Sequence, residues 1–97
     1  MTEKDIEKYL RDRVKELGGK AYKWVSPGNA GVPDRQVLLP GGKIIFIELK
    51  APGKKSTPLQ LAQQQKLIAL GFWVMVISSK DEVDGFIIIC RSIMSDD

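Results

Sequence analysis

The feature that most constrains the fold of this chain is a pair of apolar runs, residues 36–39 and 43–50, separated by Pro-Gly-Gly. Two such runs around a short glycine-containing turn predict an antiparallel β-hairpin. If residues 40–42 form a three-residue loop, Leu39 lies opposite Lys43, and every other facing pair follows from this register. A two-residue loop would instead send the side chains of one strand to the other face of the sheet.

The three-residue loop brings charged side chains together on an otherwise apolar hairpin. Asp34 then lies opposite Glu48, and facing side chains share one face with Cβ atoms about 4.5–5.5 Å apart. Lys50 joins them because strand side chains repeat every second residue. Two adjacent carboxylates repel each other and lose hydration, which raises their pKa values unless they share a cation. We therefore expect a divalent metal, Mg²⁺ or Mn²⁺, with open positions for phosphate oxygens, and Lys50 as a donor to the attacking water or the phosphate.

These residues match a known pattern. Pro33-Asp34 followed by Glu48-Leu49-Lys50 resembles the PD-(D/E)xK nuclease superfamily. The fuller pattern, residues 31–34 (Gly-Val-Pro-Asp) with residues 57–60 (Thr-Pro-Leu-Gln), is similar to the VRR-Nuc domain, the virus-type replication-repair nuclease, and the resemblance covers nearly the whole chain. It implies an endonuclease that depends on Mg²⁺ or Mn²⁺ and cuts branched DNA, as a Holliday-junction resolvase does. It also implies a metal bound by a first-helix acid, Asp34, Glu48 and the main-chain carbonyl of Leu49.

The first-helix acid has two candidates. Residues 2–17 predict an amphipathic helix, with apolar residues at spacings of four, four and three and Gly18 after the end. Glu3 projects near the centre of the apolar stripe, and Glu7 falls at its edge. Either one completes the metal site, and we prefer Glu3; the alternatives are a helix-dipole role for Glu3 and a solvated flank position for Glu7.

Composition excludes several other chemistries. The 97 residues, 43% of them hydrophobic, are enough for one small domain, residues 1–97. With no histidine and a single cysteine, Cys90, the chain has no Cys/His zinc site, no internal disulfide and no histidine-based catalysis. No apolar run approaches the roughly 20 residues that cross a bilayer, and the first residues lack the apolar segment of a signal peptide. We expect a soluble cytoplasmic protein that does not bind membranes.

The positive charge gathers around the hairpin. Residues 25–60 contain five basic side chains and two acidic ones, and the two acids are Asp34 and Glu48. Any anionic partner should dock over this part of the chain. Lys54 and Lys55 follow Lys50 closely in a loop rich in Pro and Gly, and we expect them to contact DNA phosphates.

A second helix should begin at Thr57, which with Gln60 forms a capping box. That role alone accounts for Gln60, whereas the family resemblance places this glutamine beside the catalytic lysine and in contact with DNA; both interpretations stay open. The helix runs to residue 70, and residues 72–77 form an apolar strand that we expect to be buried on both faces in a central or parallel position. Residues 85–91 form a last strand or helix segment.

We predict an α/β protein with a PD-(D/E)xK restriction-endonuclease-like core, a mixed sheet flanked by helices, and the order α-β-β-β-α-β-β. Residues 72–77 and 86–89 hold more large hydrophobic side chains than one thin sheet can cover, which predicts a C₂ homodimer. That symmetry suits a four-way DNA junction. The rival functions are a single-strand or flap nicking nuclease and a nucleic-acid-binding module that does not cut.

Overall fold

The predicted hairpin is present, formed by strands β2 (Arg35–Leu39) and β3 (Lys43–Leu49). Leu39 pairs with Lys43 across a three-residue loop, as the sequence predicts. Gly41 and Gly42 take φ values of 85° and 76°, which glycine adopts without steric cost. Continued by one residue past Arg35–Ile47, the observed register sets Asp34 opposite Glu48.

The computed structural model describes residues 1–95. Four strands form one mixed sheet in the order β1-β2-β3-β4, in which β4 runs parallel to β3 and the other neighbours are antiparallel. The predicted fold class, α/β with a mixed sheet and flanking helices, is thus confirmed. The elements besides the hairpin are α1 (Glu3–Glu16), β1 (Lys20–Lys23), α2 (Pro58–Ala69), β4 (Trp73–Ile77) and α3 (Lys80–Ser95).

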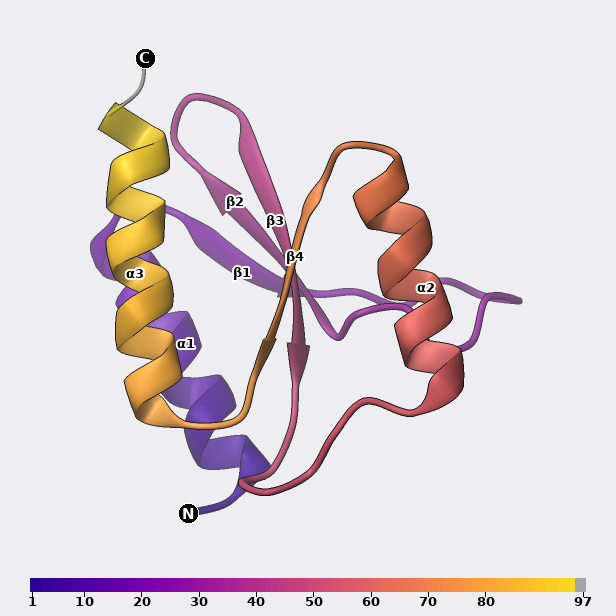
Figure 1. Ribbon diagram of the computed structural model, residues 1–97. Coiled ribbons are helices and arrows are strands. Elements are labelled where there is room, and N and C mark those ends of the chain that lie inside the picture. Colours follow the sequence, from indigo (N-terminus) through magenta and orange to yellow (C-terminus); the bar gives the residue numbers. More distant parts are fainter. Residues whose placement is uncertain (96–97) are drawn as a thin grey trace.

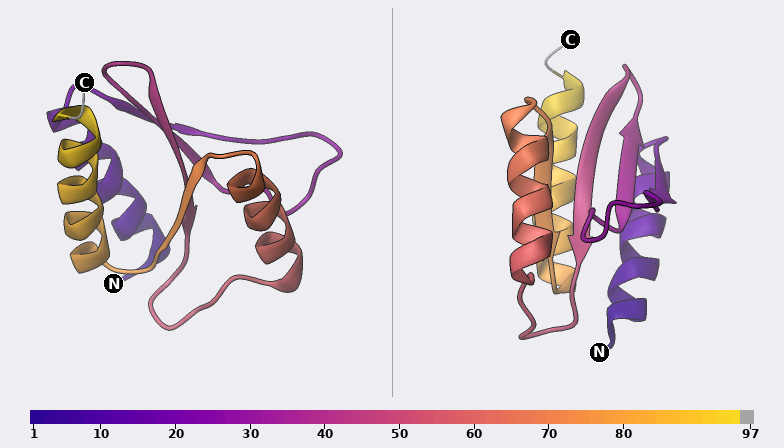
Figure 2. Two further views of the ribbon diagram at one scale, coloured as in Figure 1. Left: turned by 45° about the horizontal axis from the view of Figure 1, so that its top comes forward. Right: turned by 90° about the vertical axis from the view of Figure 1, so that its right-hand side faces the viewer.

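The helices lie on opposite faces of the sheet. Figure 1 shows α1 and α3 side by side on one face and α2 across the sheet from them, and the turned views of Figure 2 agree. Helix α1 contacts α3, β1 and β3, whereas α2 contacts β4. No helix within residues 1–95 combines the length and the apolar character that crossing a bilayer requires.

The main core lies between the sheet and the α1/α3 pair. Helix α1 begins at a capping box formed by Thr2 and Asp5, and its buried residues Ile6, Leu10 and Val14 follow the predicted apolar stripe. They pack against every second residue of the hairpin and against α3. The buried cluster contains Ile6, Leu10, Val14, Val37, Leu39, Ile45, Ile47, Leu49, Ile77, Val83, Phe86, Ile87 and Cys90.

The last element is a helix, so of the two alternatives predicted for residues 85–91 the helix is confirmed, and the strand that ends the predicted element order is wrong. Residues 80–95 form α3, and the observed order is α-β-β-β-α-β-α. The physical reason is the spacing of the buried side chains, because Val83, Phe86, Ile87 and Cys90 stand at i, i+3, i+4 and i+7 on one helical face. Tyr9 and Arg13 of α1 hold Asp84 of α3, which fixes the two helices together.

Strand β4 is parallel to β3, as expected, but it is an edge strand and is not buried on both faces. Trp73 is 51% exposed and Val76 36% exposed. The continuous apolar run predicted a central position because such runs usually belong to strands covered on both sides. Here the sheet ends at β4, and part of its apolar surface faces outward.

The loop between β1 and β2 is docked on the start of α2. Gly31 has φ +89°, and a Cβ atom there would lie 2.9 Å from Cγ of Leu59. Gln63 also donates from its side-chain amide to the carbonyl of Ala30, at 3.3 Å. Glycine at position 31 therefore meets both a backbone requirement and a close approach, and the docked loop leads directly into Asp34.

Candidate active site

Asp34 and Glu48 come together on the face of the sheet that carries α2. Asp34 Oδ2 accepts a hydrogen bond from the main-chain N–H of Leu49 at 2.9 Å, which fixes this carboxylate against β3. Sequence reasoning assigned Leu49 only through its carbonyl and missed this N–H. The signal in the sequence is the position of Asp34, one residue before β2 and opposite Glu48. At that position the main chain of the partner strand β3 has an N–H, that of Leu49, within reach of the carboxylate.

Glu48 is a buried acid, with 1% of its surface exposed. Burial, and then the neighbouring Asp34 carboxylate, raise the pKa of Glu48 to about 8. Lys50 Nζ lies 4.0 Å from Glu48 Oε2 and acts in the opposite direction. Within residues 1–95, Glu48 Oε1 has no hydrogen-bond partner. A buried oxygen of this kind is costly unless a cation or water meets it.

The two first-helix acids have different surroundings. Glu7 Oε1 lies 2.8 Å from Arg35 Nη2, so its charge is engaged in an ion pair that links α1 to β2. Glu3 is exposed, and its charge adds a small upward effect on the pKa of Glu48. In the described part of the chain no three His, Cys, Asp or Glu side chains are close enough to hold a metal ion together. Asp34, Glu48 and Lys50 are thus brought together, and Glu3 stands outside that group.

Gln60 combines the two roles that the sequence left open. Its Oε1 accepts from the N–H of Thr57 at 2.9 Å, and its own N–H donates to Thr57 Oγ1 at 3.2 Å, which is the predicted capping box. Its Nε2 also donates to Glu48 Oε2 at 3.4 Å. One side chain therefore closes the start of α2 and touches the buried acid.

The other residues predicted to bind DNA, Lys54 and Lys55, lie on the loop that follows β3. Lys54 and Lys55 are exposed in the loop after β3, which turns at Ala51 through a main-chain hydrogen bond from Lys54. Trp24 is half-buried and packs against Phe46, with ring centroids 4.9 Å apart. The main-chain N–H of Trp24 donates to the main-chain carbonyl of Asp34 at 2.7 Å, which ties the end of β1 to the start of β2.

The double role of Gln60 can be separated by mutation. Gln60→Glu keeps an oxygen for the Thr57 N–H but loses the donor to Glu48 and places a third acid beside it. We expect this variant to keep the start of α2 yet to raise the pKa of Glu48 further. Thr57→Ala removes the cap alone and should cost about 1 kcal/mol of stability. Urea unfolding and NMR titration of the Glu48 carboxyl test both; a wild-type titration in Gln60→Glu would contradict the contact.

The raised pKa of Glu48 predicts a pH-dependent stability in metal-free protein. The folded chain keeps this carboxyl protonated up to about pH 8, whereas the unfolded chain titrates it near its ordinary value of 4.5. The contribution of the Glu48 carboxyl to the free energy of unfolding is therefore complete below pH 4.5. It is lost as pH rises through 8, by at most about 1.4 kcal/mol per pH unit. Glu48→Gln should remove this slope and become more stable than wild type at high pH.

The measurement is urea unfolding between pH 5 and 9 in EDTA. Glu16→Gln, at an exposed carboxylate on α1, is the matched control and should keep the wild-type slope. Equal slopes for Glu48→Gln and wild type would mean that Glu48 is ionised in the folded chain.

Comparisons with known proteins show which family the chain belongs to. No family model matches the chain. The chain is 58% identical over 81 residues to "Putative nuclease p44" of Acyrthosiphon pisum secondary endosymbiont phage 1, across 84% of this chain and 87% of that protein. It also superimposes on a solved structure described as a VRR_NUC domain with a TM-score of 0.83 and 35% identity, across 90% of this chain and 96% of the other. With these likenesses and the carboxylate pair in place, the chain belongs to the VRR-Nuc family and is a nuclease of that type.

Proposed function

We propose that this nuclease is a Mg²⁺- or Mn²⁺-dependent endodeoxyribonuclease that hydrolyses phosphodiester bonds in branched DNA, with the four-way junction as its substrate. The observation that carries the proposal is the buried Glu48 carboxyl with the half-buried Asp34 and Lys50 beside it. Three apolar side chains at these positions of the hairpin would stabilise the fold better than two adjoining acids and one ammonium group do. The acids and the ammonium group are suited to phosphate chemistry with a cation.

The residues present fit a divalent metal. Glu48 Oε1 is buried without a partner, and Asp34 already raises the pKa of Glu48, so a cation would relieve both conditions. Carboxylate and carbonyl oxygens are the ligands that Mg²⁺ and Mn²⁺ prefer. Asp34, Glu48 and the Leu49 carbonyl would hold the metal, with Glu3 contributing through water. A bound metal of this kind activates water and neutralises charge on the phosphate.

The other side chains orient and bind the substrate. Lys50 is half-buried beside Glu48 and would position the water that attacks the phosphorus, because its ammonium is held close to that carboxylate. Gln60 keeps Glu48 in place through its amide. Lys54 and Lys55 are exposed on the loop after β3 and would contact the DNA backbone. A DNA-cutting enzyme of this kind would act in the cytoplasm of a host cell.

A homodimer would supply the two cuts that a symmetric junction needs. The sheet ends at β4, and large apolar side chains are exposed on and beside this edge. Two copies related by a two-fold axis would cover each other's apolar side chains with the same surface. The exposed set, from α2, the turn after it, β4 and α3, comprises Ile68, Leu70, Phe72, Trp73, Val76, Ile88 and Ile89.

The non-cutting alternative has weak support from the site. A module that only binds nucleic acid gains nothing from two carboxylates turned toward phosphates, since like charges repel. A nicking nuclease for single strands or flaps would use the same residues, so the substrate panel below separates it from junction cleavage.

Asp34→Asn and Glu48→Gln should each reduce cleavage of a labelled four-way junction in Mg²⁺ or Mn²⁺ by at least about a hundredfold, because each removes a ligand charge. Duplex, flap, splayed-arm and junction DNAs are compared in parallel, with EDTA as the metal control. Urea unfolding shows that the variants fold. Glu16→Gln is the matched surface control and should cut at the wild-type rate. Cleavage by wild type in EDTA, or wild-type rates in both site variants, would refute the proposal.

The dimer is tested by light scattering at micromolar concentration. We expect twice the mass of one chain, and Val76→Lys with Ile88→Lys should give single chains because like charges would meet across the two-fold axis. Leu59→Lys, at an exposed position in the first turn of α2, is the control and should leave the mass unchanged. A single-chain mass for wild type with junction DNA bound would exclude the dimer and favour nicking.

A further inference from the structure

A basic pocket outside the candidate active site lies at the outer edge of β1. It has a volume of about 190 Å³, the share of roughly six water molecules. Three of its lining residues, Arg11, Lys15 and Lys20, carry positive charge and are called the pocket cations below. Among residues 1–95 no acidic side chain lines the pocket, and the lining consists of Arg11, Lys15, Gly19, Lys20, Ala21 and Tyr22.

The acids nearest to this pocket in the sequence are engaged elsewhere. Asp12 lies 2.8 Å from Lys8 Nζ, and Glu16 lies 3.3 Å from Arg13 Nε. Among residues 1–95 no ion pair joins a pocket cation to a carboxylate. The hydrogen bond from Lys8, and further the charges of two pocket cations, lower the pKa of Asp12. The pocket therefore has an excess of positive charge, although the Asp12 carboxylate interacts at longer range with Arg11 and Lys15.

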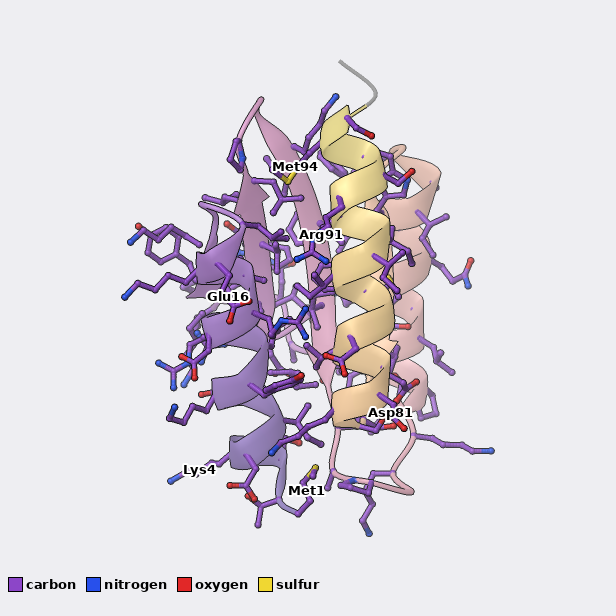
Figure 3. All side chains as sticks on the ribbon, turned by 90° about the vertical axis from the view of Figure 1, so that its left-hand side faces the viewer. Met1, Lys4, Glu16, Asp81, Arg91 and Met94 are labelled. Atoms are coloured by element: carbon purple, nitrogen blue, oxygen red, sulfur yellow. The ribbon has the colours of Figure 1, made fainter. Side chains whose placement is uncertain are left out.

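The charge continues along α1. At 100° per residue, Lys4, Lys8, Arg11 and Lys15 fall within about 60° of the helix circumference, well away from the buried stripe. All four side chains are exposed. In Figure 3, Lys4 points away from α3 on the outer side of α1. One outer stripe of the helix is thus basic from its first turn to the pocket.

The pocket spans the edge of the sheet, because Arg11 and Lys15 belong to α1 on one face whereas the side chains of Lys20 and Tyr22 project from β1 toward the other face. Tyr22 pairs with Gln36 and Lys20 with Leu38, so their side chains lie on the same face as Glu48. Continuing this register sets Trp24 opposite Asp34, in agreement with their main-chain hydrogen bond. Lys20 stands four residues before Trp24, about 13 Å along the strand. Tyr22, 55% exposed, lines the pocket, and Trp24 stands two residues further along the chain, on the same face and next to Asp34.

We infer that Arg11, Lys15 and Lys20 form a second phosphate-binding site, which holds the DNA strand that is cut at Asp34 and Glu48. The stretch of about 13 Å from Lys20 to Trp24 corresponds to roughly four nucleotides at 3.4 Å each along one DNA strand. The guanidinium of Arg11 can bind a phosphate through two parallel hydrogen bonds, and the lysines add point charges. Tyr22 and Trp24 offer ring faces for the intervening bases. The inference rests on the proposed action on DNA.

The test measures binding of fluorescein-labelled junction DNA in EDTA at several salt concentrations, so that no cutting interferes. Arg11→Gln with Lys20→Gln should weaken binding roughly ten- to hundredfold and reduce the salt slope by about two. The control pair, Lys66→Gln with Arg91→Gln, removes the same charges from exposed positions on α2 and α3 and should change affinity less than about threefold. Arg11→Lys with Lys20→Arg should restore most of the affinity.

Equal losses of DNA affinity in the pocket pair and the control pair would overturn the inference. Wild-type affinity in the pocket pair, or no DNA binding by the wild-type protein, would overturn it as well. If the pocket pair loses affinity only for DNA that carries a 5′-phosphate, the pocket binds a terminal phosphate. If it loses affinity equally for DNA with and without a 5′-phosphate, the pocket binds an internal phosphodiester. Failure of the proposed function shows separately, as bound DNA that stays uncut in Mg²⁺ and Mn²⁺.

Discussion

The register of β2 against β3 is the constraint on which the rest of the structure depends. A three-residue loop with two glycines at positive φ sets Leu39 opposite Lys43. That single pairing sends Ile45, Ile47 and Leu49 into the core and turns Glu48 toward α2. A slip by one residue would bury a different set of side chains and would separate Asp34 from Glu48. The core and the site therefore share one geometric cause.

The carboxylate pair has a cost that the surrounding structure must offset. Burying Glu48 beside Asp34 holds the pKa of Glu48 far above its usual range, and one of its oxygens has no partner within residues 1–95. Stability alone would favour an apolar residue at this position. The thirteen-residue apolar core on the other face of the sheet supplies the burial that lets the fold tolerate such a residue.

Much of this could be predicted from the sequence because the signals were local. The loop length, the Thr57 cap and the Asp34–Glu48 pairing each depend on residues close together in the chain or directly opposed in one hairpin. At residues 85–91 the sequence does not decide between a strand and a helix, because the run of isoleucines hides a helical stripe that appears only once Val83 and Cys90 are included. The exposure of β4 depends on where the sheet ends, which no local pattern encodes. The pocket at β1 likewise unites a helix and a strand edge, and only tertiary structure brings Arg11 to Lys20.

Gln60 links the integrity of a helix end to the position of a buried charge. Helix ends open and close locally with free energies far below that of global unfolding. Each opening of the first turn of α2 would withdraw the amide from Glu48 together with the bond to Thr57. The carboxylate would then be free to move until the turn closes again. The fraction of time that Glu48 is correctly held is therefore set by the local folding equilibrium of a single helical turn, and substitutions that never touch the site could change it.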